Sequence, residues 1–270
     1  MTDSRQVKTA RTVAEARELL APARARGASI GLVPTMGALH RGHLSLLETA
    51  RAENDVLVMS LFVNPAQFDE QADLAAYPRD EVADAAAAAA AGVDLIFAPP
   101  PEEIYPPGFQ TWVDVEEESR GGEGDARPGH FRGVATVCLK LFTIVRPTRA
   151  YFGRKDAQQL AVIERLVRDL HLELELRVLP IVRDPDGLAL SSRNARLTPD
   201  ERVRALSLPR ALHDARHADD PVASARAALD GLEPEYVELR RLDGGTVLAA
   251  AVRVGSTRLI DNVSLEGERP

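Results

Sequence analysis

The chain has 270 residues, of which 33 are Lys or Arg and 41 are Asp or Glu, so its formal net charge is −8 at pH 7. Hydrophobic residues make up 45% and charged residues 27% of the sequence, which excludes a disordered or collagen-like chain. The acidic balance argues against binding nucleic acid through bulk positive charge, but it allows a local basic pocket for a small anion. We expect one large domain or two modest ones, and no nucleic-acid partner.

Cys138 is the single cysteine of the sequence. It excludes a disulfide framework and a cysteine-rich zinc module, and it suits a reducing cytosol. No stretch approaches the roughly 18 apolar residues of a membrane helix, and the N-terminal segment lacks the apolar core of a signal peptide. We expect a cytoplasmic location and no membrane partner. The N-terminal segment instead indicates a short lead-in and then a helix, because Val13, Ala16 and Leu20 share one helical face.

Short apolar runs alternate with helical patterns over the first two thirds of the chain. The runs that indicate strands are 29–34, 56–63, 94–99, 149–153 and 172–180. The helical patterns between them are 43–53, 79–92, 133–145 and 156–170. Strands alternating with helices predict a parallel α/β sheet. The almost wholly apolar run at 56–63 is typical of a central strand buried on both faces.

Two segments depart from this alternation. The run Ala85–Ala91 is strongly helix-forming and favours an exposed helix without a function. Residues 99–132 are rich in Pro, Gly and Glu. They indicate a long excursion from the sheet, a kind of segment that is often functional.

The last third of the chain changes character. After a polar, turn-rich stretch, Thr198 and Pro199 predict the N-cap and first residue of a helix. The segments 235–242 and 247–261 indicate two further strands. We therefore expect a catalytic parallel-sheet domain followed by a small α+β domain. The expected domains are residues 1–181 and 182–270.

The sequence PTMGALHRGH, residues 34–43, follows a predicted strand and opens a predicted helix. Ligands of open α/β sheets bind at such strand ends. Gly37 and Gly42 allow close backbone approach, and the helix N-terminus offers free N–H groups to an anion. His40 and His43 can point to one spot and donate to a phosphate oxygen. A zinc site, which lacks an obvious third ligand, and a purely structural pair are alternatives.

The sequence FVNPAQF follows the most apolar predicted strand. Asn64 and Gln67 have uncharged amides that suit hydroxyl and carboxylate recognition, because each offers both a donor and an acceptor. The alternative is a simple turn, since Asn-Pro is a common turn signal.

The sequence YFGRKDAQQL, residues 151–160, again joins a predicted strand to a helix through a glycine. Lys155 can reach a phosphate as a compact charge, and Asp156 is a hard oxygen ligand suited to Mg²⁺. Gln158 and Gln159 can hydrogen-bond a polar substrate. The alternative is a surface Lys–Asp pair.

Two polar segments complete the set of motifs. In DGLALSSRN, residues 186–194, hydroxyls and a guanidinium form a mobile-looking loop that can wrap a triphosphate. A linker between domains is the alternative. In RPGHFRGV, residues 127–134, His130 lies between Arg127 and Arg132 in a small basic cluster. The alternative there is a solvated loop with a helix cap.

Several common signatures are absent from the sequence. It has no GxxxxGK[ST], no GxGxxG and no GxSxG, so a P-loop enzyme, a dinucleotide fold and a serine hydrolase have no support. Cys138 lies in an apolar helical pattern, which favours an inert core thiol.

Together these motifs resemble those of the pantothenate synthetase (pantoate–β-alanine ligase) family. PTMGALHxGH, FVNPxQF, RPGHFxGV, FGxKDxQQ and DGLAxSSRN occur in the family's order and spacing, and the resemblance runs from about residue 7 to residue 265. HxGH alone is shared by many nucleotidyltransferases and class I aminoacyl-tRNA synthetases. One departure is Arg154, where the family usually has Glu, which implies a changed local charge near the ATP site.

The resemblance implies a Rossmann-like parallel sheet of the HxGH nucleotidyltransferase type with a smaller α+β C-terminal domain. It implies a cytoplasmic homodimer that uses ATP and Mg²⁺ to join pantoate to β-alanine through pantoyl adenylate, releasing pyrophosphate and AMP. His43 as proton donor, His40 and Lys155 would be catalytic; Gln67, Gln159 and Asn64 would bind pantoate or β-alanine, and Asp156 the metal. The implied ATP site comprises Met36, Gly37, Ala38, Leu39, His40, Arg41, Gly42, His43, Gly153, Arg154, Lys155, Asp156, Val182, Leu190, Ser191, Ser192 and Arg193.

Two other functions are weaker alternatives. A nucleotidyltransferase acting on a phosphorylated acceptor should have more fixed cations on the acceptor side, where this chain has the amides of Gln67 and Gln159. A catalytically silent nucleotide-binding protein should have lost His43, Lys155 or the serine-arginine loop, all of which are present.

Overall fold

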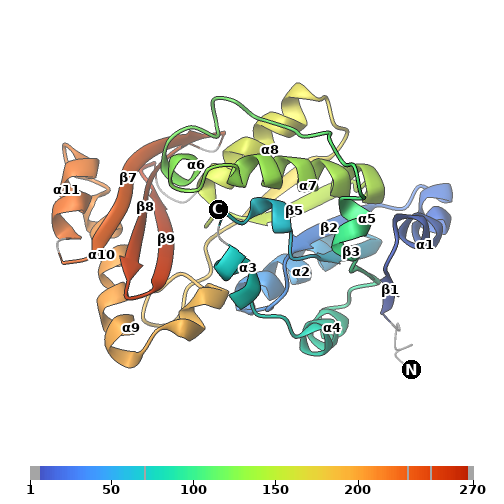
Figure 1. Ribbon diagram of the computed structural model, residues 1–270, viewed down its shortest axis with the longest axis horizontal. Helices are drawn as coiled ribbons and strands as arrows, with labels where there is room; N and C mark the ends of the chain where they lie inside the picture. The colour runs from blue at the N-terminus through green and yellow to red at the C-terminus, as the bar shows by residue number, and fades with distance from the viewer. Residues whose placement is uncertain (1–6, 70, 230, 244, 267–270) are drawn as a thin grey trace.

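The computed structural model describes residues 7–69, 71–229, 231–243 and 245–266. Within these residues, six parallel strands form a sheet in the order β1-β4-β3-β2-β5-β6, and three antiparallel strands form a second sheet in the order β7-β8-β9 (Figure 1). The larger sheet consists of β1 (Lys8–Ala10), β2 (Ile30–Thr35), β3 (Val56–Leu61), β4 (Leu95–Phe97), β5 (Arg149–Gly153) and β6 (Glu175–Leu179). The predicted α/β fold class with a smaller C-terminal part is confirmed.

Helices cover both faces of the larger sheet. They include α1 (Val13–Ala25), α2 (Arg41–Glu53), α4 (Glu81–Ala90), α7 (His130–Val145) and α8 (Ala157–Asp169). Because side chains alternate along a strand, Leu32 and Val58 pack with α1, α7 and α8, whereas Val33 and Met59 pack with α2 and α4. Figure 1 shows α7 and α8 on one side of the sheet and α2 on the other. Burial on both faces explains why these strands read as continuous apolar runs.

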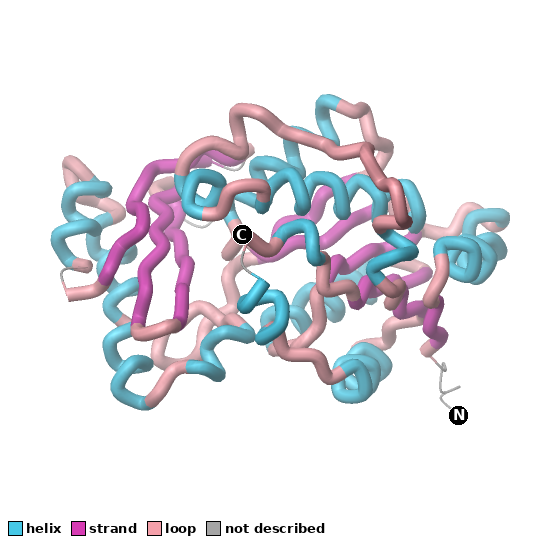
Figure 2. The backbone as a smooth tube through the Cα atoms, in the orientation of Figure 1, coloured by secondary structure: helices cyan, strands magenta, loops and turns pink. Residues whose placement is uncertain are grey.

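The smaller sheet stands apart from the larger one (Figure 2). Its strands are β7 (Glu233–Leu242), β8 (Gly245–Val254) and β9 (Thr257–Ser264), and the helices that precede it are α9 (Pro199–Ala205), α10 (Ser207–Ala215) and α11 (Pro221–Ala228). The single strand predicted over 247–261 is wrong, because the chain turns at Gly255, whose φ of +58° lies in the left-handed region. The predicted helix start is correct: Thr198 and Glu201 form a capping box at α9.

Short elements escaped the sequence prediction. Strand β1 was expected to be part of the lead-in, and its three residues are too few to show a period. The excursion over 99–132 contains α5 (Pro101–Ile104) and α6 (Gly122–Ala126), and a further short helix, α3 (Gln71–Ala76), follows β3. Cys138 is buried on α7, and burial raises the pKa of its thiol to about 12, as expected of an inert core thiol. No helix of the described residues has the length and apolar character needed to cross a bilayer.

Candidate active site

The order of the larger sheet reverses between β2 and β5, which are neighbours. From β2 the chain continues to β3 and β4 on one side, and from β5 it continues to β6 on the other. The loops after β2 and β5 therefore diverge and leave a crevice beyond the carboxyl ends of the strands, where open α/β sheets bind ligands. A cleft of about 1660 Å³, including its open mouth, lies at this edge.

Many of the residues singled out in the sequence line this cleft. They are Met36, His43, Asn64, Gln67, Arg127, His130, Lys155, Asp156, Gln158, Gln159, Ser191, Arg193 and Asn194. The smaller sheet contributes a further wall with Tyr236, Arg258 and Asn262. The other residues expected in the ATP site lie in or beside the same segments but do not line the cleft. They are Gly37, Ala38, Leu39, His40, Arg41, Gly42, Gly153, Arg154, Val182, Leu190 and Ser192.

The two histidines of the HxGH motif lie next to each other at the start of α2 and are joined by a hydrogen bond. His40 is the N-cap residue, and its Nδ1 accepts the N–H of Gly42 at 3.1 Å. The Nδ1 of His43 accepts the N–H of His40 at 3.3 Å, and the ring centroids lie 4.1 Å apart. Because Nδ1 is an acceptor in both rings, each neutral ring carries its proton on Nε2.

Both rings are mainly neutral at pH 7. Burial, followed by the charges of His40 and Lys155, lowers the pKa of His43 to about 3. Burial and the charge of Lys155 also lower the pKa of His40. The zinc alternative lacks its ligands, since the described residues contain no cluster of three or more His, Cys, Asp or Glu side chains that could hold a metal ion. The pair can offer neutral N–H donors to a phosphate.

Two N–H groups of the loop before α2 are bound within the protein. The carboxylate of Asp84 on α4 accepts the N–H of Ala38 at 2.9 Å and that of Leu39 at 2.8 Å. Gly37 makes room for it, because with a φ of +88° a Cβ there would lie 2.7 Å from Asp84 Oδ2. A buried carboxylate thus occupies two donors in the segment that was expected to line the ATP site. In the sequence, Asp84 stands out only as an acidic residue before an alanine run.

Asn64 supports Gln67 rather than facing a ligand. Its Nδ2 donates to Gln67 Oε1 at 3.0 Å and to the backbone oxygen of Gly133 at 3.2 Å. Its Oδ1 accepts the hydroxyl of Tyr105 at 2.8 Å and the N–H of Ala66 at 3.3 Å. An amide has two donors and two acceptor positions, so Asn64 is fully used and its expected role as a substrate contact is not supported.

Gln67 keeps its amide donor for the cleft. The turn prediction holds at the same place, because Asn64 caps the short helix η1 (Pro65–Gln67). The Oε1 of Gln67 accepts from Asn64, and its Nε2 has no partner among the described residues. Gln67 therefore presents an N–H₂ group to a ligand from a fixed turn.

In the RPGHFRGV segment, His130 is buried and the segment is hydrogen-bonded to the Gln67 turn, so it is not a solvated loop. His130 Nδ1 donates to the backbone oxygen of Gln67 at 2.8 Å, and Arg127 donates to the same oxygen at 3.1 Å and to His130 Nε2 at 3.3 Å. Burial and the charge of Arg127 lower the pKa of His130 to about 4, so the ring is neutral with its proton on Nδ1. Arg132 leaves the expected cluster: it pairs with Asp114 at 3.4 Å on the surface.

Some polar side chains at the turn between β5 and α8 face the cleft, whereas another forms hydrogen bonds within the protein. The side chain of Lys155 is 20% exposed, with its Nζ 3.6 Å from Asp156 Oδ1, so a plain surface pair is disfavoured. Gln158 is used within the protein: its Oε1 accepts the N–H of Glu123 at 2.9 Å, and its Nε2 contacts the backbone oxygens of the 118–121 segment. Gln159 lines the cleft.

The serine-arginine segment is a structured turn rather than an open loop. Leu190 donates its N–H to the oxygen of Val182 at 3.0 Å. Ser191 then caps the short helix η2 (Ser192–Arg196). Arg193 pairs with Asp73 of α3 at 3.0 Å. Burial raises the pKa of Asp73, but the charges of Arg193 and its neighbour Arg196 overcome this and lower it.

Comparison with known proteins identifies the family. Residues 8–264 match the family model described as pantoate-beta-alanine ligase. The chain belongs to the pantoate–β-alanine ligase family. It is 51% identical to a pantothenate synthetase of Moorella thermoacetica, over 94% of this chain and 97% of the relative. It is 50% identical to one of Roseiflexus castenholzii, over 95% and 99%.

Solved structures agree with the family. A pantothenate synthetase from Thermus thermophilus superposes with a TM-score of 0.89 at 44% identity, covering 96% of this chain and 99% of that one. A pantoate-beta-alanine ligase from Francisella tularensis, complexed with β-γ ATP and β-alanine, gives a TM-score of 0.86 at 35% identity over 97% and 99%. Membership of the pantoate–β-alanine ligase family makes this chain a ligase of pantothenate biosynthesis.

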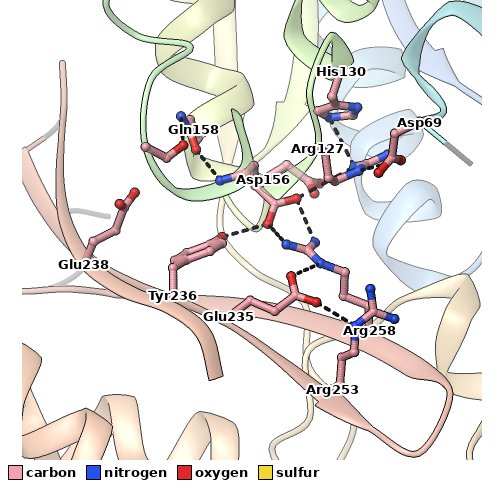
Figure 3. Close-up of polar contacts among 12 residues, drawn as sticks. Asp69, Arg127, His130, Asp156, Gln158, Glu235, Tyr236, Glu238, Arg253 and Arg258 are labelled. Carbon is pink, nitrogen blue, oxygen red and sulfur yellow. Dashed lines mark hydrogen bonds and ion pairs between the residues drawn. The ribbon is translucent and has the colours of Figure 1, made fainter. Parts of the chain in front are cut away.

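In this member of the pantoate–β-alanine ligase family, the far wall of the cleft contains an ion-pair network that the sequence did not reveal. Arg258 of β9 donates to both carboxylate oxygens of Glu123, at 2.8 and 2.6 Å, and the hydroxyl of Tyr236 donates to Glu123 Oε1 at 2.9 Å. Burial raises the pKa of Glu123, but Arg258 and Tyr236 overcome this and lower it. Figure 3 shows Arg258 and Tyr236 reaching from the smaller sheet toward Arg127. The smaller sheet is thus part of the cleft wall.

Proposed function

We propose that this chain joins pantoate to β-alanine with ATP in two steps. The pantoate carboxylate attacks the α-phosphorus of ATP and displaces pyrophosphate, which gives pantoyl adenylate. The amine of β-alanine then attacks the acyl carbon and displaces AMP. A free carboxylate is a poor acyl donor because its leaving group would be oxide, whereas AMP leaves readily. The family description names pantoate and β-alanine, and the Francisella relative was solved with β-γ ATP and β-alanine; both support the proposal.

The observation that carries the proposal is the shared cleft at the switch point. His43, Gln67, Lys155 and Arg193 come from four separate segments and line one cavity. Phosphoryl transfer depends mainly on positioning and on stabilising charge. No residue needs to form a covalent bond with the substrate, which agrees with the inert state of Cys138.

On the nucleotide side we propose the ATP site that the family resemblance implies, with Lys155 and Arg193 as its cations. The Nε2–H groups of His40 and His43 would donate to the reacting phosphate without adding charge. Arg193 pairs with Asp73 at 3.0 Å, which leaves its other guanidinium N–H groups for a phosphate.

On the acid side we propose Gln67 and Gln159 as the contacts for the hydroxyl and carboxylate groups of pantoate. Beside them, Val134, Val137 and Leu141 of α7 give the cleft an apolar surface. Such a surface suits the two methyl groups of pantoate.

We propose that Asp156 binds the Mg²⁺ of a bound magnesium–ATP complex. Mg²⁺ usually takes one or two carboxylates together with substrate phosphates and several waters, and the Asp156 side chain is 46% exposed and open to such a complex. When bound, the ion would neutralise negative charge on the phosphates.

We also propose that residues 1–181 and 182–270 act as two domains around the cleft and that the chain works as a cytoplasmic homodimer. The sheets support the division, because β6 ends the larger sheet at Leu179 and β7 begins the smaller one at Glu233. The dimer and the location rest on the family resemblance. Light scattering on the purified chain tests the dimer: a mass close to one chain contradicts it.

Isotope transfer tests the reaction directly. The chain is incubated with ATP, Mg²⁺ and pantoate labelled with ¹⁸O in its carboxylate, and β-alanine is then added. We expect pyrophosphate release that needs both ATP and pantoate, then pantothenate and AMP, with one ¹⁸O in each AMP by mass spectrometry. ADP and phosphate as products, or AMP without label, would refute the adenylate route.

A further inference from the structure

Asn262 of β9 reaches from the smaller sheet into the turn that carries Lys155. Its Nδ2 donates to the backbone oxygens of Arg154 at 3.0 Å and of Lys155 at 2.9 Å. The residue is 2% exposed, and its Oδ1 is buried without a partner among the described residues. An unpaired buried oxygen is unfavourable. The two donated bonds, both to this turn, are therefore what the amide contributes.

The preceding residue of β9 holds a second segment of the nucleotide side. Asp261, whose side chain is 1% exposed, accepts from both terminal nitrogens of Arg183, at 2.6 and 3.0 Å. Arg183 also donates to the backbone oxygen of Gly187 at 3.1 Å, within the hairpin that leads to Ser191 and Arg193. Two consecutive residues of the smaller sheet thus hold the two segments that bring Lys155 and Arg193 to the cleft.

The larger sheet fixes the Lys155 turn at its ends. The N–H of Arg154 donates to the oxygen of Leu179 at 2.9 Å, and α8 begins at Ala157. Between these points the peptide oxygens of residues 154 and 155 set the direction of the Lys155 side chain. Their donor comes from Asn262, on the other sheet.

We propose that Asn262 is a positioning residue for Lys155. By holding the two peptide oxygens, it aims the Lys155 ammonium at the phosphate position in the cleft, and it makes that aim depend on the docked position of the smaller sheet. The inference rests on the proposed function, because it needs Lys155 to act on a phosphate. A misplacement of about 1 Å in such a group costs roughly 10²-fold in rate.

A double-mutant cycle between Asn262 and Lys155 tests the proposal. In the wild-type background, Asn262→Ala is expected to lower kcat for pantoate-dependent pyrophosphate release by about 10²-fold. In the Lys155→Ala background the same substitution is expected to change kcat by less than about threefold, because the group that it aims is gone. The same large factor in both backgrounds shows a merely structural role and overturns the proposal.

Two further variants separate positioning from stability. Asn262→Asp keeps the shape of the side chain but has no N–H donor, so we expect it to lower kcat as Asn262→Ala does. If the alanine variant does not fold, Asn262→Asp replaces it in the double-mutant cycle. Val263→Ala is the matched control, because Val263 is the next residue of β9, is partly buried and packs against the core of the smaller sheet. We expect it to lower Tm with kcat near wild type. A parallel loss of kcat in Val263→Ala overturns the proposal.

Binding of ATP separates this inference from the proposed function. If the wild-type chain releases no pyrophosphate with ATP and pantoate, the proposed function fails. The cycle is then measured as the Kd of ATP by isothermal titration calorimetry without pantoate. Weaker binding on Asn262→Ala in the wild-type background, but not in the Lys155→Ala background, supports the positioning role. Equal weakening in both backgrounds refutes it.

Discussion

Each histidine around the cleft is held in one tautomer by its hydrogen bonds. The Nδ1 atoms of His40 and His43 accept backbone N–H groups, so these rings carry the proton on Nε2. His130 donates from Nδ1 to the oxygen of Gln67 and accepts on Nε2 from Arg127. The positive charge of the cleft therefore comes from its Lys and Arg side chains. The neutral His43 ring carries an Nε2–H that can donate a hydrogen bond.

The lowered pKa values predict a loss of stability in acid. The pKa of His130 falls from 6.5 to about 4 and that of His43 from 6.5 to about 3, so between these values and 6.5 the unfolded chain binds protons that the folded chain does not. Each of the two histidines therefore contributes its full stability above about pH 6.5. As the pH falls below this value, each lowers the free energy of unfolding by up to about 1.4 kcal/mol per pH unit. Urea unfolding at pH 7.5 and pH 5 measures the loss.

The variant His130→Asn isolates one of these groups. Its Nδ2 can replace the Nδ1 donor to the oxygen of Gln67, but it does not titrate. We expect the free energy of unfolding to fall less between pH 7.5 and pH 5 in this variant than in the wild type. An unchanged fall would show that His130 does not take part.

Replacement of Lys155 tests the main cation of the proposed site. We expect Lys155→Ala to slow pantoate-dependent pyrophosphate release by about 10²–10³-fold, the usual effect of losing one preorganised charge donor. Its contact with Asp156 is long, at 3.6 Å, so Tm should change little. Lys140→Ala is the control, because Lys140 lies 4.6 Å from the ring centre of Phe109, away from the cleft lining. Near-normal release by Lys155→Ala would remove Lys155 from the mechanism.

Among the elements, those with a long apolar period were predictable from the sequence. Strand β3 and helix α8 appear within a few residues of their predicted bounds, because burial on two faces and an amphipathic helix leave clear patterns. Strand β1 left no pattern, since it is short and gains its place by pairing with β4. The turn at Gly255 carried a signal that the prediction missed, because Gly255-Ser256 between two strand-like runs is typical of a two-residue hairpin loop.

The meeting of the motifs was predictable for a different reason. Parallel strands end at one edge of their sheet, so the glycine-marked loops after β2 and β5 had to flank the same crevice. The partners of these loops were not predictable. Asp84 lies 46 residues from Ala38, and Arg258 lies 135 residues from Glu123. Only the packing of α4 and of the smaller sheet decides these contacts, and neither an alanine run nor an ordinary strand pattern indicates them.

Helix α7 sets the position of the Gln67 turn through a glycine. A Cβ at Gly133 would lie 2.2 Å from the oxygen of Ala66 and 2.7 Å from the nitrogen of Gln67. Because both neighbours are backbone, Gly133→Ala must push α7 and η1 apart, at a cost of about 1–3 kcal/mol. We expect a lower Tm and a higher KM for pantoate in steady-state assays.

A second position on α7 is the control for this prediction. Thr143 is exposed on the same helix, so Thr143→Ala should leave both Tm and KM close to wild type. A normal pantoate KM in Gly133→Ala, together with a lowered Tm, would show that the turn does not depend on this contact.

At the scale of the whole molecule, the smaller sheet joins the rest of the chain through polar contacts and through an apolar cluster of Ala157, Val247 and Ala249. Arg240 of β7 donates to the backbone oxygens of Glu118 and Arg120, and Arg258 of β9 pairs with Glu123. The segment around α6, which the sequence indicated only as a long excursion, therefore joins the smaller sheet to the cleft. Both arginines are paired with carboxylates, Arg240 with Glu238 and Arg258 with Glu123 and Glu235, so they serve the junction between the parts of the chain.

The pair Arg258–Glu123 should be the strongest single contact across this junction. Both side chains are largely buried, at 17% and 9% exposure. Arg258→Met leaves the Glu123 carboxylate with the Tyr236 hydroxyl and with Arg127 at 3.7 Å, and should lower the free energy of unfolding by up to about 3–5 kcal/mol. Adding Glu123→Gln removes the stranded charge and should restore part of the loss. Arg253→Met is the matched control: Arg253 pairs with Glu235 but is 45% exposed, so its loss should stay within about 1 kcal/mol. Urea unfolding measures all four chains, and equal losses for Arg258→Met and Arg253→Met, or no recovery in the double variant, would contradict this account of the junction.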